Sequence, residues 1–134
     1  MADGYALALQ KGLNDALEAL PSLAGKVFAE APQNAVLPYV RIGAIEPRPM
    51  RSSAGRGAIL TFSIEAHSRP TNQGRVEATR LAETIVAALD ENEAAVPLAD
   101  HELVSLSWLT TTVAPDADAQ DFTAIAAFEA VIDG

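Results

Sequence analysis

The sequence contains no cysteine. Disulfide bonds and thiolate metal sites are therefore excluded, and the composition is compatible with a reducing compartment such as the cytoplasm. The first residues carry no basic stretch ahead of an apolar run, so we expect no secretory signal. No apolar run approaches the roughly 20 residues of a membrane-spanning helix, and we expect no membrane association. A chain of 134 residues can bury a core without covalent or metal cross-links, so we expect one domain over residues 1–134.

Positive charge is missing from the last third of the chain. Residues 1–90 contain all nine Lys and Arg and nine of the 18 Asp and Glu, so their formal charges sum to zero. Residues 91–134 contain the other nine carboxylates and no Lys or Arg, which gives the net charge of −9. Such a surface should repel DNA rather than hold it. Solubility alone is the alternative use of this acidic surface.

Catalytic and cofactor motifs are also missing. His67 and His101 have no partner at metal-ligand spacing, and no Gly-x-Ser-x-Gly elbow is present. Residues 55–57, Gly-Arg-Gly, are too short for a phosphate-binding loop. Asp116 and Asp118 resemble the start of a calcium loop, but the glycine and the distal Glu of such a loop are absent. Aromatic residues are few and do not alternate with basic ones, as they do in binders of single-stranded nucleic acid. We therefore expect no enzyme, no metal site and no cofactor.

What the sequence does contain is an alternating stretch at residues 57–69, around which the rest is organised. A period of two is typical of a strand that is buried on one face. We expect this strand to form the middle of the sheet. The apolar side is predicted to be Ala58, Leu60, Phe62, Ile64 and Ala66, and the polar side Thr61, Ser63, Glu65 and His67.

The remaining patterns predict two helices and further strands. Helix-type periodicity covers residues 3–20, with Asp3 as a possible N-cap and Pro21 as the end, and also residues 75–90, which Thr71 or Asn72 can cap. Strand-type alternation covers residues 39–45, 102–113 and 121–132, with short strands possible at 26–28 and 96–98. In the strand at 39–45 we expect Val40, Ile42 and Ala44 to face inward, and in the last strand Phe122, Ala124, Ala126, Phe128, Ala130 and Ile132.

This order of elements predicts the fold class. Strands joined by short turns favour antiparallel pairing, and two amphipathic helices need a sheet to cover. We predict an α+β fold: a mostly antiparallel sheet of about four main strands with two helices packed on one face.

Residues 46–57 are the most unusual stretch. Prolines, glycines and serines argue against regular structure, so we expect an extended loop. Arg48, Arg51 and Arg56 make it the one basic cluster of an acidic protein. Long loops of this kind are commonly functional or mobile, which leaves two interpretations: a solvated hairpin tip, or an arm that reaches an acidic partner surface.

Three sequence segments in this order resemble a known family. They are Leu-Pro-Tyr-Val-x-Ile-Gly at 37–43, Leu-Thr-Phe-Ser-Ile-Glu-Ala-His-Ser-Arg at 60–69, and Ala-x-x-Leu-Ala-x-x-Ile-x-x-Ala-Leu at 78–89. An N-terminal helix precedes them and a strand pair follows. The chain thereby resembles the tail terminator, or tail completion, proteins of long-tailed bacteriophages and of phage-like gene transfer agents.

The resemblance implies a structural role in a virion or gene transfer agent particle that is assembled in the host cytoplasm. Proteins of this family form a hexameric ring on the head-proximal end of the tail tube. The ring stops tube polymerisation and offers a docking face to the head-completion, or stopper, protein. DNA passes through the central hole without specific binding. The family has no catalytic residues and no cofactor.

A closed ring needs two different complementary surfaces on each subunit. We predict that Arg48, Arg51 or Arg56 reaches carboxylates of an adjacent subunit or of the tube protein. We further expect acidic residues to face the DNA channel, with Glu65, Asp116 and Asp118 as candidates. Two alternatives stay open: another head–tail connector or tail tube protein, and, from a different class, a small-molecule-binding α+β module.

Overall fold

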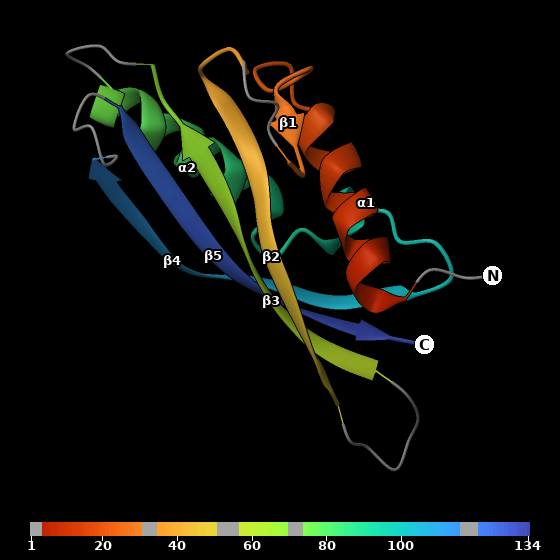
Figure 1. The fold of residues 1–134 in the computed structure, drawn as a ribbon. Helices are drawn as coiled ribbons and strands as arrows, with labels where there is room; N and C mark the ends of the chain where they lie inside the picture. Colours follow the sequence, from red (N-terminus) through yellow and green to blue (C-terminus); the bar gives the residue numbers. More distant parts are fainter. Residues whose placement is uncertain (1–3, 31–34, 51–56, 70–73, 116–120) are drawn as a thin grey trace.

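Two helices lie against a strongly twisted five-stranded sheet (Figure 1). The structure is a computed structural model that describes residues 4–30, 35–50, 57–69, 74–115 and 121–134. In chain order the elements are α1 (Tyr5–Glu18), β1 (Val27–Phe28), β2 (Tyr39–Pro49), β3 (Gly57–His67), α2 (Gly74–Leu89), the 3₁₀ helix η1 (Glu93–Ala95), β4 (Glu102–Pro115) and β5 (Phe122–Asp133).

The strand order is β1-β2-β3-β5-β4, so the stretch predicted as the middle of the sheet is indeed its central strand. β2 with β3, β3 with β5 and β5 with β4 are antiparallel. β1, the short strand expected near residue 27, adds a two-residue parallel pairing beside the start of β2. The predicted α+β class and its four long strands are confirmed.

One apolar cluster lies between the helices and a single face of the sheet. The predicted inner residues of β3 are all buried, and Phe62 and Phe128 stack at its centre with ring centroids 5.4 Å apart. α1 contributes Leu9, Leu13 and Leu17 to the same cluster to which α2 contributes alanines and leucines. Both helices therefore cover the same face, because their side chains meet the same alternate residues of the strands. The other face has no helix on it among the described residues.

A β-bulge in β2 changes which residues face inward. Ile42 pairs with Ile64 but Ile45 pairs with Phe62, so two residues of β2 oppose Ser63. The extra residue shifts the alternation, and Ala44 is exposed while Ile45 packs against the core. The prediction that Ala44 faces inward was wrong for this reason.

β2 is also longer than the sequence predicted. It continues to Pro49, so residues 46–49, expected to begin the loop, pair with the first residues of β3. The N–H of Met50 donates to the carbonyl of Gly57 at 3.0 Å. Alternation from that bond turns Pro47 and Pro49 away from β3, so their missing N–H groups cost no bond within the hairpin. Residues 51–56 lie outside the described residues.

The start of α1 differs from the prediction. Gly4 occupies the N-cap position and makes no side-chain cap hydrogen bond, and the helix ends at Glu18 with Ala19 as its C-cap. The proposed caps Asp3, Thr71 and Asn72 lie outside the described residues.

The segment at 96–98 does not form the short strand that was proposed. It follows η1 and crosses α1, with Val96 buried in the core. The crossing is close: a side chain at Gly12 of α1 would collide with the carbonyl oxygen of Pro97. Packing on a helix, rather than pairing at the edge of the sheet, thus fixes this connection.

Candidate functional site: the uncovered face and edges of the sheet

The face of the sheet opposite the helices, here called the outer face, is the candidate site. Its β3 residues are half-buried by their neighbours in the sheet, whereas Ile125 is 41% exposed and Ser107, Thr110 and Thr112 of β4 are exposed. Most are small, hydroxyl-bearing or β-branched. They include Ile59, Thr61 and Ser63 of β3, Ile125, Ala127 and Val131 of β5, and Ser105, Ser107, Thr110 and Thr112 of β4. The register also places Arg41, Glu46, Arg48, Glu65 and Glu129 on this face.

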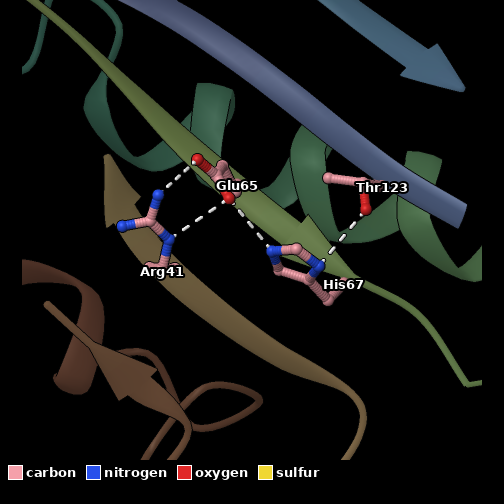
Figure 2. Close-up of polar contacts among 4 residues, drawn as sticks. All are labelled: Arg41, Glu65, His67 and Thr123. Atoms are coloured by element: carbon pink, nitrogen blue, oxygen red, sulfur yellow. Dashed lines mark hydrogen bonds and ion pairs between the residues drawn. The ribbon is translucent and has the colours of Figure 1, made fainter. Parts of the chain in front are cut away.

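Four polar residues from three strands form one network on this face (Figure 2). Arg41 of β2 donates to both oxygens of Glu65 on β3, at 3.3 Å from Nε to Oε1 and 3.1 Å from Nη2 to Oε2. The Nε2 atom of His67 lies 3.1 Å from Glu65 Oε1, and its Nδ1 atom lies 3.2 Å from the hydroxyl of Thr123 on β5. Two-point contact fixes the guanidinium in the plane of the carboxylate, which is the strongest geometry for such a pair.

The surroundings hold this network in place. The ring of His67 stacks on Tyr39 with centroids 4.7 Å apart, and Phe28 of β1 meets Tyr39 edge-on at 5.9 Å. Gly43, in the bulge, leaves room for the polar side chains of β3, because a Cβ there would lie 2.6 Å from Ser63 Oγ and 3.5 Å from Glu65 Oε2. The bulge therefore has a role at the site as well as in the strand.

The network neutralises its own charge. Glu65 and His67 are each less than one-fifth exposed, and the carboxylate is already paired with Arg41. Covering an ion pair that is hydrogen-bonded on both sides costs much less than covering a lone charge. The outer face is thus suited to contact with another protein surface, as the core of an interface is.

Glu65 was predicted to face a DNA channel. Its pairing with Arg41 means that it adds little negative charge to the surface. Of the other residues chosen from the sequence, Arg48 is exposed and its register with Ile59 places it on the outer face of β2. Arg51, Arg56, Asp116 and Asp118 lie outside the described residues.

Sequence reasoning missed the role of Arg41, and it predicted the strand at 102–113 without recognising it as an edge strand with exposed apolar side chains. Arg41 lies on β2 directly opposite Glu65 on β3. Oppositely charged residues at paired positions of neighbouring strands indicate an ion pair, but this pairing is visible only when the register of the two strands is known. The edge residues Val104, Trp108 and Leu109 are exposed, because register shifts in β4 after Leu103 and Trp108 displace its side chains. Alternation alone does not reveal such shifts.

The edge of the sheet formed by β4 is covered along only part of its length. Along β4, groups from the end of α2 and from η1 occupy part of the edge: Asp90 accepts from the N–H of Trp108, and Glu93 from that of Leu106. The N–H of Glu91 donates to the carbonyl of Leu106. Ladder alternation places the N–H and C=O of Thr111 and Val113 on the same outward side, beyond this cover.

A second ion pair joins β3 to α2. Glu77 accepts from the backbone N–H of Arg69 at 2.7 Å and from its Nε at 2.9 Å. Desolvation raises the pKa of Glu77, but the hydrogen bonds and charge of Arg69, with a contribution from Lys26, outweigh it, so the pKa lies below its ordinary value. The carboxylate is therefore charged near neutral pH and ties the start of α2 to the end of the central strand.

Within the described ranges, no group of three or more His, Cys, Asp or Glu is placed to hold a metal ion. In the same part of the chain, no helix is both long and apolar enough to cross a membrane.

These features define a class: an α+β protein in which no described helix covers one sheet face and that face carries a paired Arg–Glu network, as expected of a subunit in an assembly. Residues 11–133 match the family model of tail completion protein gp17, and the chain belongs to this family. It is therefore a structural protein of a phage-type tail.

A solved structure has the same fold. A chain of the virion of a native gene transfer agent (GTA) particle superposes with a TM-score of 0.83 at 22% sequence identity, covering 98% of this chain and 100% of that chain. No curated protein matches the sequence.

Proposed function

We propose that this protein forms a ring, a hexamer, that caps the head-proximal end of the tail tube of a phage or gene transfer agent particle. The ring terminates tube polymerisation and joins the tail to the head-completion protein, leaving a channel through which DNA passes. The observation that carries the proposal is the outer face of the sheet. No described helix covers it, and its central ion pair, Arg41 with Glu65, is internally neutralised, in a chain of the tail completion family.

Charge distribution supports a head-to-tail ring. β2 carries both Glu46 and Arg48 exposed at one side of the sheet and has no excess of carboxylates, whereas β4, β5 and their connections carry Glu102, Glu129 and Asp133 with no Lys or Arg. The acidic side of one copy can meet the side of the next that lacks this excess of negative charge when identical copies are related by rotation, and two acidic sides then do not face each other. DNA in the channel would then pass acidic surfaces, for which Asp116 and Asp118 remain the proposed residues, because Glu65 is already paired with Arg41.

Imaging of particles assembled without this protein tests the function. If the ring terminates the tube, tails should be overlong and variable in length, and heads should lack attached tails. Re-expression of the wild-type chain serves as the control and should restore one tail length. Normal tails attached to heads in the absence of the protein would contradict the proposal.

The role of the basic residues is tested separately. Replacing Arg48, Arg51 and Arg56 together by Ser should weaken ring formation or its seating on the tube by about tenfold or more, since several charge pairs are lost at once. The control replaces Arg75 and Arg80 of α2 by Ser. Assembly of the triple variant at wild-type levels would show that these arginines have no interface role.

A further inference from the structure

The open part of the β4 edge is the strongest unassigned feature of the molecule. From Leu103 to Pro115, β4 contains no charged residue, and Thr110 to Val113 are all β-branched. Soluble proteins usually protect such an edge with charges, prolines or a covering segment. Here the cover from Asp90, Glu91 and Glu93 reaches Leu106 and Trp108, and the edge groups of Thr111 and Val113 lie beyond it. Among the described residues no segment pairs with this stretch of the edge, and such an edge is suited to pairing with another strand.

The opposite edge of the sheet offers a matching space. β1 pairs with β2 only at Val40 and Arg41. Beyond that point, a groove of about 520 Å³ lies between β2 and α1. Its lining includes Arg41–Ile45 on the strand side and Leu7 on the helix side, and Leu7 is 44% exposed. The groove thus continues the track of β1 along β2.

The open edge and the groove lie at the same height along the strands. The cross-strand register joins Ile42, Ile64, Ala126 and Thr111 in one row across the sheet. The next row joins Arg41, Glu65, Ile125 and Thr112. A copy rotated about an axis along the strands would therefore bring its β4 edge level with the groove, without sliding. β4 is antiparallel to β2 in the sheet, so the new pair would be antiparallel.

We propose that the groove beside β2 receives the β4 edge of a second copy of this chain. This inference rests on the proposed ring and names the contact that closes it. Charge favours the heterologous arrangement, since the chain around β4 carries only carboxylates, whereas at the groove Arg41 is balanced by Glu65, and Arg48 accompanies the carboxylates of Glu30 and Glu46. Two β4 edges facing each other would instead bring carboxylates together.

Cross-linking tests the contact. Because the chain contains no cysteine of its own, only the introduced cysteines can react. Ala44 lines the groove and is exposed, as are Thr110 and Thr112 on β4. The variants A44C/T110C and A44C/T112C, assembled on tails and treated with a short bifunctional maleimide, should give a ladder of linked copies. The control A44C/E83C, with its second cysteine on the exposed side of α2, should give no ladder beyond background.

A measurement on the unmodified protein makes the test independent of the variants. The amides of Thr111 and Val113 should exchange hydrogen at least tenfold more slowly in assembled tails than in the free protein. No ladder, or unchanged exchange at both amides, in tails of normal length would overturn the β4 contact while leaving the proposed function intact. Failure of the function itself would appear instead as normal tails in particles that lack the protein.

Discussion

A single carboxylate, Glu77, fixes how the central strand leads into α2. Its bonds to the main chain and the guanidinium of Arg69 span the connection between the two elements. Because both partners are partly in water, the contribution to stability is modest. Its dependence on pH is more informative than its size.

Replacing Glu77 by Gln should lower the midpoint of thermal unfolding at pH 7 by a few degrees. The folded-state pKa of Glu77 lies below its ordinary value of 4.5, so the stabilisation is present above the unfolded pKa and is lost as the pH falls through the folded pKa. The difference between variant and wild type should therefore shrink to nearly zero in strongly acidic buffer. Calorimetry at pH 7 and at low pH measures this, with E83Q on the exposed side of the same helix as the control. A difference that is independent of pH would contradict the assignment.

At the scale of elements, the 96–98 segment that packs across α1 holds this helix in place. Glycine inside a helix normally destabilises it by about 1 kcal/mol relative to alanine. At Gly12 the sign should reverse, because a methyl group there would collide with the backbone of Pro97 and with Val96. Backbone at this crossing cannot move aside as the end of a flexible side chain would.

The variant G12A should accordingly lose about 1–2 kcal/mol of unfolding free energy, since overpacking costs more than the gain in helix propensity. Urea unfolding measures the change. Ala87→Gly, at an exposed position of α2, is the control and should lose about 1 kcal/mol, because helix propensity alone acts there. Stabilisation by G12A would show that the 96–98 segment does not pack on α1 as described.

Regular elements were predictable from the sequence, and irregular ones were not. The alternation in β3 and β5 identified their buried residues, because with an unbroken period of two only one face of the strand can be the buried face. The bulge at Gly43 and Ala44 and the extension of β2 through Pro47 and Pro49 depend on the partner strand, which local pattern does not contain. Arg41 and Glu65 were likewise visible as residues but not as a pair, because their contact follows from register.

At the scale of the whole molecule, charge should keep the protein off DNA. The net charge is −9, and the cations that exist are partly engaged, as Arg41 and Arg69 are. Too few free cations are left to release the counterions that drive DNA binding. In a mobility-shift assay at about 0.15 M salt, double-stranded DNA should show no shift at micromolar protein. A basic DNA-binding domain run alongside serves as the positive control, and a clear shift would contradict the view of the protein as a conduit.

The two prolines at the end of β2 make this end of the sheet edge a poor partner for another strand. The backbone nitrogens of Pro47 and Pro49 face solvent at the edge of β2, where a neighbouring strand would need N–H donors. Proline has no N–H group, so neither residue can donate such a hydrogen bond. If the β2 edges of two copies lay side by side, carbonyl groups would face carbonyl groups along this stretch. The β2 ends of two copies are therefore poorly suited to pair with each other, which disfavours symmetric dimers and fibrils built through this edge.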